Sequence, residues 1–351
     1  MLPRWKPALY TVVLMTLLTA CSQEVVKTQP QPNQTQPATP QGPEQPPAPT
    51  YAYTAPFTGM GTNEKLEGKR PVMVMVNNHP YARPQSGLDK ADIVYEVLAE
   101  GEVTRFLAIY HSQKAEAIGP VRSIRPYFIK IGTGFDAFLI HAGGSPEALE
   151  TLAHADYGNI NEISNGAYFW RVNFRKAPHN LYTDLDRIEK AVTDKGMRST
   201  TELPSFSFLP ADTEITAGQP ATKIDVTYHT LYKAGYQYDA SSKKYLRFTE
   251  GKPHVDLTTN EQLAVTNLLV IATRHRVLDN EGRRDVDVVG PGDGYLFQHG
   301  KARQVKWVRK NGVIHMYEDA ALTKELPLLP GNTWINIVPN MPGLSSAVKF
   351  Q

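Results

Sequence analysis

The sequence predicts an α+β protein, in which a mixed-sheet, α/β-like N-terminal domain is followed by a β-rich C-terminal domain. Three observations lead to this prediction. Residues 71–76 form a continuous apolar run of strand length, as expected for a strand buried on both faces of a sheet. Helix-start signals at Pro126 and Ser145 alternate with strand-like runs in the first half. In the second half, short strand-like runs separated by turns dominate.

The chain begins with the features of an exported lipoprotein. Arg4 and Lys6 precede an apolar run at residues 8–18, which has signal-peptide length and is too short for an ordinary spanning helix. Leu18-Thr19-Ala20-Cys21 then matches a bacterial lipobox, and Cys21 is the only cysteine. We therefore predict a signal peptide at residues 1–20, acylation of Cys21, for example by palmitate, and a cell-membrane anchor that leaves the protein on the extracytoplasmic side. The alternative is a plain secretory signal with an accidental cysteine.

Residues 21–56 have the composition of a disordered tether. Between residues 22 and 56 there are nine prolines and seven glutamines, and almost nothing that could be buried. Such a segment cannot offset the entropy that it would lose on ordering. We expect a flexible spacer that holds the folded part away from the lipid bilayer.

Residues 57–202 are predicted to form the N-terminal domain. The run at residues 71–76 is followed by strands at 91–98 and 103–111, which a short turn joins into a hairpin. Pro126 suits the first turn of a helix, another strand is expected at 135–140, and Ser145 has the features of the N-cap of a second helix. A third helix is predicted at residues 184–195, where Gly196 would end it.

Three arginines in this domain indicate an anion-binding site. Arg122 and Arg125 lie between prolines, and Arg105 comes from the strand before them. A strand, a Gly-Gly turn and a capped helix follow, with Gly143, Gly144 and Ser145 at the turn. Guanidinium forks and helix-terminal N–H groups both suit phosphate or carboxylate oxygens, so we predict that these six residues converge on an anion.

A second loop concentrates polar groups on a proline-kinked backbone. It carries Arg175, Lys176, His179 and Asn180. Loops of this composition often bind ligands. The alternative is a solvated loop whose asparagine and histidine satisfy their own backbone.

The chain resembles the YerB-type lipoproteins of Gram-positive bacteria over about residues 60–340. The stretches that match are Asp92-Ile93-Val94-Tyr95-Glu96 with Glu100-Gly101, Thr104-Arg105-Phe106, Gly119-Pro120-Val121-Arg122-Ser123-Ile124-Arg125-Pro126, His141-Ala142-Gly143-Gly144-Ser145 and Ala177-Pro178-His179-Asn180-Leu181-Tyr182. That family has paired domains without an assigned function, so the resemblance implies a lipoprotein and names no reaction.

A fainter similarity is to the LytR-CpsA-Psr domain, which transfers glycan polymers from polyprenyl pyrophosphate to peptidoglycan. Asp92 and the segment around Ser123 and Arg125 look like parts of that family's motifs, but Pro126 stands where the family has an aspartate. Mg²⁺ chemistry needs hard oxygen ligands, and only Asp92 is carried over. Asp92 is thus a metal ligand, and Mg²⁺ a cofactor, only if the protein is an enzyme; otherwise no cofactor is expected.

Residues 203–222, with three prolines, are predicted to connect the two domains, and residues 223–351 form the β-rich C-terminal domain. The only helix-like stretch there is at residues 260–265. The net charge of +2 is too small to indicate a partner. No basic stripe with interleaved aromatics is present, so we expect no nucleic-acid partner.

The sequence therefore predicts an extracytoplasmic lipoprotein that binds an anionic envelope ligand, such as a phosphate- or carboxylate-bearing glycan or lipid, including polyprenyl phosphate. Two alternatives remain open. One is a diverged phosphotransferase or phosphatase. The other is an envelope protein-interaction scaffold, whose arginines pair with the acidic residues Glu96, Glu100 and Glu102.

Replacing Cys21 with alanine should abolish acylation, because the acyl-bearing group attaches through the cysteine sulfur. Metabolic labelling with a palmitate analogue, together with membrane fractionation, measures this. A Ser22→Ala variant serves as the control and should be labelled like the parent. Labelling that persists without Cys21 would show that the anchor is wrongly assigned.

Overall fold

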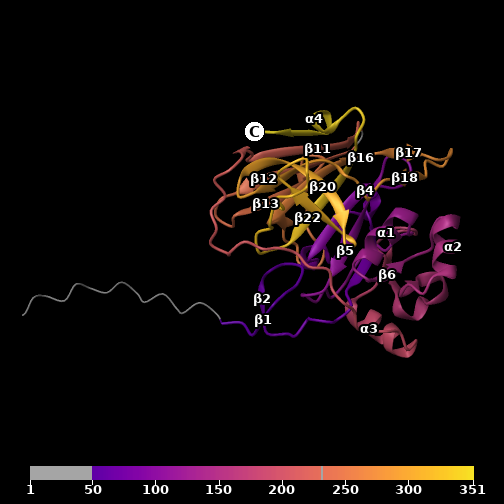
Figure 1. Ribbon diagram of the computed structural model, residues 1–351. Helices are drawn as coiled ribbons and strands as arrows, with labels where there is room; N and C mark the ends of the chain where they lie inside the picture. Colours follow the sequence, from indigo (N-terminus) through magenta and orange to yellow (C-terminus); the bar gives the residue numbers. More distant parts are fainter. Residues whose placement is uncertain (1–49, 231) are drawn as a thin grey trace, which may run out of the picture. The chain divides into compact units, whose positions relative to one another are not determined.

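The computed structural model describes residues 50–230 and 232–351 (Figure 1). The predicted signal peptide at 1–20, Cys21 and the tether up to residue 49 lie outside the described residues. Residues 50–351 form one compact unit. No helix in this part of the chain is long and apolar enough to cross a membrane.

A mixed eleven-stranded sheet forms the centre of the fold. Its strands run in the order β10-β20-β19-β16-β22-β4-β5-β3-β6-β7, and β21 pairs with β20. Parallel pairs join β16 to β22, β22 to β4, β3 to β6 and β6 to β7. In chain order the strands are β3 (Val72–Asn77), β4 (Ile93–Leu98), β5 (Thr104–Tyr110), β6 (Phe138–His141), β7 (Asn159–Asn161), β10 (Gln219–Pro220), β16 (Asn267–Thr273), β19 (Gly292–Gln298), β20 (Lys301–Lys310), β21 (Val313–Tyr317) and β22 (Thr333–Pro339).

A second, antiparallel sheet packs against the first. Its order is β14-β13-β12-β11-β23, with β15 paired to β13. Buried and exposed residues alternate along β11, as expected for a sheet with one face in the core. The strands are β11 (Lys223–His229), β12 (Tyr232–Asp239), β13 (Lys244–Thr249), β14 (Lys252–Pro253), β15 (Ala264–Val265) and β23 (Val348–Phe350).

Short hairpins and helices complete the fold. The two-stranded pairs are β1 (Tyr53–Thr54) with β2 (Gly61–Thr62), β8 (Trp170–Arg171) with β9 (Leu181–Tyr182), and β17 (His275–Val277) with β18 (Arg284–Val286). The α-helices are α1 (Pro126–Gly134), α2 (Pro146–His154), α3 (Leu185–Asp194) and α4 (Leu344–Ala347). Figure 1 shows α1, α2 and α3 gathered beside the N-terminal strands, whereas α4 lies over the second sheet.

The large sheet is buried on both faces. One face packs on α3, through Ile188 and Ala191, and on the second sheet. The other face packs on α1 and α2, through Phe128 and Leu152. This double coverage explains why the run at residues 71–76 is apolar without alternation.

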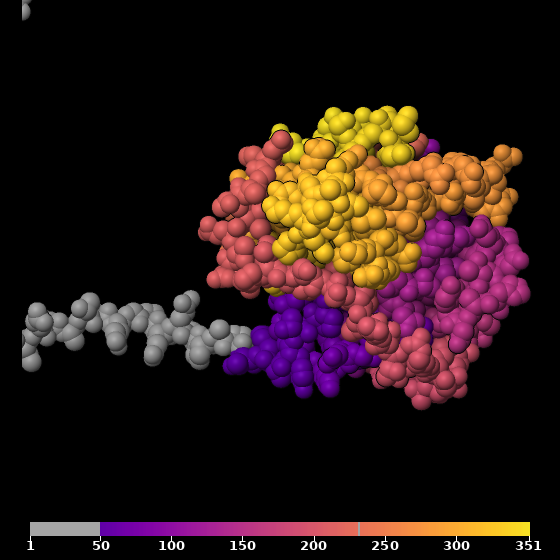
Figure 2. Space-filling model, in the orientation of Figure 1, coloured from indigo at the N-terminus to yellow at the C-terminus, as the bar shows by residue number. Residues whose placement is uncertain are grey.

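The predicted α+β fold class is confirmed, with a mixed sheet in the N-terminal region and antiparallel pairing in the C-terminal region. The hairpin of β4 and β5 is present. Pro126 lies in the first turn of α1, and Ser145 caps α2 as predicted. The domain boundaries at 57–202, 203–222 and 223–351 stay predictions. Strands from both sides of residues 203–222 share the large sheet, and Figure 2 shows the two sides meeting over one continuous surface.

Two local predictions differ from the structure. Residues 260–265 are not helical, because Asn260 has a positive φ of 57° and Ala264 enters β15. Folded structure also starts earlier than residue 57. Strand β1 lies within the predicted tether. Ala55 is buried, and its N–H donates to the Met60 carbonyl at 2.8 Å, which closes a turn.

A fully buried ion pair joins the two sheets. Arg247 of β13 donates to Glu96 of β4 at 2.8 Å, and both side chains have no solvent exposure. The Tyr232 hydroxyl donates to the other Glu96 oxygen at 2.8 Å, as does Thr104. The Arg247 guanidinium lies 4.4 Å from the centre of the Trp334 ring. The pair is thus desolvated, hydrogen-bonded and covered by an aromatic face.

Replacing Arg247 with methionine should lower the free energy of unfolding by about 3 to 5 kcal/mol, because the Glu96 carboxylate would stay buried without a counter-charge. The double variant Glu96→Gln, Arg247→Met should recover part of this loss, since no uncompensated charge remains. Chemical denaturation followed by circular dichroism measures both. A single variant as stable as the parent would show that the pair does not hold the sheets together.

Candidate functional site

The candidate site begins where strand β3 ends. Asn77, its last residue, folds back so that its side-chain Oδ1 accepts the backbone N–H of His79 at 3.0 Å. The His79 Nδ1 in turn accepts the backbone N–H of Tyr81 at 3.2 Å, which caps a short 3-10 helix, η1 (Pro80–Ala82). Two consecutive side-chain acceptors therefore fix this turn at the carboxyl end of a strand, where ligands bind in open α/β sheets.

The second predicted loop brings His179 to the same place. Its ring stacks on that of His79, with centroids 4.6 Å apart and an angle of 22° between the planes. Asn77 Nδ2 lies 2.9 Å from His179 Nδ1. Arg175 supports the loop, because its guanidinium donates to the Pro84 carbonyl at 2.5 Å and to the Tyr182 hydroxyl.

The other two residues of this loop do not join the cluster. Asn180 donates to the Val172 carbonyl at 3.1 Å and accepts from Arg171. Its side chain therefore makes hydrogen bonds within the hairpin of β8 and β9. Lys176 is exposed, and its carbonyl accepts the N–H of His179. The solvated-loop alternative therefore describes Asn180 but not His179.

The hydrogen bonds determine the tautomers of both histidines. A backbone N–H can only donate, so His79 Nδ1 is an acceptor and its neutral ring carries the proton on Nε2. Asn77 Oδ1 already accepts from His79, so Asn77 presents its Nδ2 to His179, which is likewise protonated on Nε2. Among the described residues, neither Nε2 has a hydrogen-bond partner. Both rings thus offer a free N–H donor.

Arg122 is close enough to these two rings for its charge to lower the pKa of both. Its backbone is fixed in an extended segment, since its N–H donates to the Met75 carbonyl at 2.8 Å and its carbonyl accepts from Ala142 at 3.1 Å. Its half-buried guanidinium has no hydrogen-bond or ion-pair partner within residues 50–230 and 232–351, and its Nε is buried. Burial and the charge of Arg105 lower the pKa of Arg122.

The neighbouring charges also act on the two imidazoles. Burial first, and then Arg83 and Arg122, lower the pKa of His79. Burial, His79 and Arg122, with a smaller effect of Arg175, lower the pKa of His179. Both rings are therefore held neutral near pH 7, and in the part of the chain that the structure describes no carboxylate pairs with the nearby Arg122 guanidinium.

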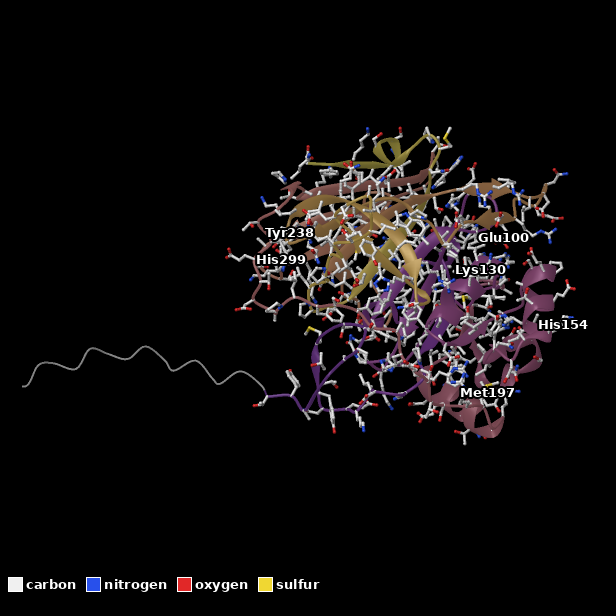
Figure 3. All side chains as sticks on the ribbon, viewed as in Figure 1. Glu100, Lys130, His154, Met197, Tyr238 and His299 are labelled. Atoms are coloured by element: carbon white, nitrogen blue, oxygen red, sulfur yellow. The ribbon has the colours of Figure 1, made fainter. Side chains whose placement is uncertain are left out.

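Arg105 and Arg125 lie in a different environment from Arg122. Both pair with Glu100, labelled in Figure 3, in the turn between β4 and β5. The Arg105–Glu100 distance is 3.0 Å, and Arg105 also donates to the Ser123 carbonyl at 2.7 Å. Glu100 thus supplies the counter-charge for two of the three predicted arginines, whereas Arg122 has none among the described residues.

The predicted Gly-Gly turn lies next to the arginine segment, but protein groups already occupy two of its backbone donors. The Gly143 N–H donates to Asn161 Oδ1 at 2.9 Å, and the Ser145 N–H donates to the Ile124 carbonyl at 3.3 Å. The Ser145 hydroxyl caps α2 by accepting the Ala148 N–H. Gly144 packs against Ile124, and a Cβ there would lie only 3.0 Å from the Ile124 side chain, which is a tight contact. The turn therefore positions the Arg122 segment, and these donors are not free for an anion.

Asp92 does not fit a Mg²⁺ site. It is fully buried just before β4, and its oxygens accept the backbone N–H groups of His111 at 2.6 Å and Ser112 at 3.0 Å. The part of the chain that the structure describes contains no cluster of three His, Cys, Asp or Glu side chains suited to a metal ion.

The other acidic residues of the scaffold alternative have partners of their own. Glu96 pairs with Arg247, and Glu102 lies 2.6 Å from His229. Of the three acidic residues, only Glu100 pairs with the predicted arginines.

Sequence reasoning found Arg122, Arg175 and His179 but missed Asn77, His79 and Tyr81. The signal was the polar Asn77-Asn78-His79-Pro80 break directly after a buried strand. It indicated the end of the strand, and nothing in the sequence linked it to a loop about a hundred residues away.

Comparison with known proteins places this architecture in a family. Residues 57–198 match the family model described as the N-terminal domain of a protein of unknown function, DUF3048, and residues 224–335 match its C-terminal domain. The putative lipoprotein YerB of Bacillus subtilis (strain 168) is 43% identical over 294 residues, which cover 83% of this chain and 88% of that protein. The crystal structure of YerB from Bacillus subtilis is similar, with a TM-score of 0.77 and 40% identity over 85% of this chain and 99% of that chain.

His79 and His179 should each titrate below the ordinary imidazole pKa of about 6.5, because burial and the nearby arginines disfavour the charged form. Long-range ¹H–¹⁵N NMR across about pH 5 to 8 measures the pKa and the tautomer together. We expect neutral rings protonated on Nε2. In the control variant Asn77→Ala, only His179 should lose its fixed tautomer, since Tyr81 still holds His79. A proton on Nδ1 of either parent ring would contradict the assignment.

Proposed function

The chain belongs to the YerB-type family of putative lipoproteins with paired DUF3048 domains, and from this premise we propose that it binds an anionic ligand of the cell envelope at Arg122, His79 and His179. The lipid anchor on Cys21 would hold the protein on the extracytoplasmic side of the cell membrane. The ligand would be a phosphate or carboxylate group carried by a glycan or a lipid.

One observation carries this proposal. The cluster offers a guanidinium and two Nε2–H groups, all of them donors, and no carboxylate among the described residues pairs with any of the three. A half-buried, unpaired guanidinium is costly, because burial removes water without supplying another partner. An anion would provide the missing acceptors and the missing charge.

The donor set also favours a fully ionised oxyanion. Neutral hydroxyls and amides carry donors that would face the donors of the site, whereas phosphate and carboxylate oxygens only accept. The fork of Arg122 suits two such oxygens, and the imidazoles can reach others. A phosphate has more acceptor oxygens than a carboxylate and thus matches three donors better.

Binding without turnover agrees better with the site than the phosphotransferase alternative. That reaction would need hard oxygen ligands for a metal next to the anion. Asp92 precedes the amino end of β4, whereas the anion site lies at the carboxyl end of β3, which runs in the same direction. Six strand residues separate these ends by roughly 20 Å. Asp92 is therefore too far away to serve the site.

Replacing Arg122 with alanine should weaken the binding of inorganic phosphate and pyrophosphate by about 1.5 to 3 kcal/mol, the contribution of a hydrogen bond to a charged group. Without ligand, thermal stability should stay unchanged or rise slightly, because the repulsion between Arg122 and Arg105 disappears. Calorimetric titration and thermal melts of the full-length protein in a non-ionic detergent measure both effects.

The control is Arg276→Ala, which removes an exposed arginine from β17 that pairs with Asp285. This variant should bind like the parent. If the parent binds neither anion, and Arg122→Ala only lowers the melting temperature, Arg122 is structural and the proposal is wrong.

A further inference from the structure

An exposed aromatic ring adjoins the candidate anion site. The centre of the Tyr81 ring lies 5.2 Å from that of His79 and 6.0 Å from that of His179. Its side chain is nevertheless 76% exposed, among the most exposed large apolar residues that the structure describes. A single exposed tyrosine needs no explanation. A tyrosine that contacts both donor rings of a candidate site is a different case.

The backbone under Tyr81 is fixed although its ring is open to solvent. The Tyr81 N–H is held by His79 Nδ1, and the next residue, Ala82, is fully buried and donates to the His79 carbonyl at 2.8 Å. Pro80 restricts the chain on the other side. Little conformational entropy would be lost if a ligand packed on the ring, since a tyrosine side chain has only two rotatable angles.

We infer that Tyr81 is a stacking platform for a sugar ring, and that the anion bound beside it is the phosphate of a glycosyl phosphate. This inference rests on the proposed anion site. The two ring spacings place Tyr81 next to the donors, so a group bonded directly to the phosphate would reach its open face.

A sugar suits this surface for a chemical reason. One face of a pyranose carries C–H groups with partial positive charge, which pack on the electron-rich face of an aromatic ring. Its hydroxyls point outward and stay hydrated, because Tyr81 is open to water. A lipid chain would need a continuous apolar surface to leave water, and the neighbours of Tyr81 are imidazoles that carry free donors.

Titration calorimetry on the full-length protein in non-ionic detergent tests the inference with inorganic phosphate, N-acetylglucosamine 1-phosphate, farnesyl phosphate and uridine 5′-monophosphate. The sugar phosphate should bind more tightly than inorganic phosphate. Tyr81→Ala should weaken the binding of the sugar phosphate by about two- to tenfold, the range of an aromatic contact. The same variant should bind inorganic phosphate as tightly as the parent does. Tyr81→Phe should still bind the sugar phosphate more tightly than inorganic phosphate, because it keeps the aromatic ring. Tyr157→Ala, which removes a 38%-exposed tyrosine ahead of β7, serves as the control and should bind like the parent.

The outcomes separate the two proposals. If inorganic phosphate binds and the sugar adds nothing, or if Tyr81→Ala weakens both ligands equally, the platform is wrong and the anion site stands. If farnesyl phosphate or uridine 5′-monophosphate binds more tightly than the sugar phosphate, Tyr81 contacts a lipid or a nucleobase instead. Either result would contradict the inference that Tyr81 binds a sugar ring. If no phosphate compound binds to the parent protein, the anion site fails, and the platform fails with it.

Discussion

The buried ion pair of Glu96 and Arg247 is the interaction on which the rest of the structure depends. It joins residues 151 positions apart, one in each sheet. From it, hydrogen bonds reach the candidate site by two routes. Glu96 accepts from Asn78, the residue after β3, and Arg247 contacts His254, which is bonded to Gln85. Gln85 then donates to the Asn77 carbonyl at 2.9 Å. The turn that carries His79 is therefore connected by hydrogen bonds to the ion pair that joins the two sheets.

Charge compensation explains why the arginines of this region have different roles. A buried guanidinium is tolerated when a carboxylate is fixed beside it, and Arg247, Arg105 and Arg125 each have one. The β4–β5 turn that supplies Glu100 is braced by the C-terminal half, because Arg284 donates to the Gly101 carbonyl at 2.8 Å. Glu100 is thus held in place where it pairs with Arg105 and Arg125. The charge of Arg105 acts on Arg122, but no carboxylate among the described residues pairs with Arg122, and this is the charge that the proposed ligand would compensate.

Local patterns predicted the fold well, because strands buried on both faces, N-caps and helix-starting prolines leave signals within a few residues. They predicted the site only in part. Arg122 and the loop of His179 stood out by composition, whereas His79 acts through a ring contact with a residue a hundred positions later. Glu96 and Glu100 looked equivalent in sequence, and only the tertiary structure shows that one pairs across the sheets and the other within the arginine cluster. Conversely, the lipobox at Cys21 is readable from the sequence alone and lies outside the described residues.

Two hydrogen bonds fix the tautomers of the two rings in the candidate site. The Tyr81 backbone N–H donates to His79 Nδ1. The side-chain oxygen of Asn77 accepts the backbone N–H of His79, so the amide nitrogen of Asn77 faces His179 Nδ1. With both Nδ1 atoms acting as acceptors, protonating either ring would place two N–H groups against each other and break the turn. The rings therefore stay neutral and donate from Nε2. In the proposed function, these fixed donors and the permanent charge of Arg122 would favour an oxyanion over a cation and over ligands with few acceptor atoms.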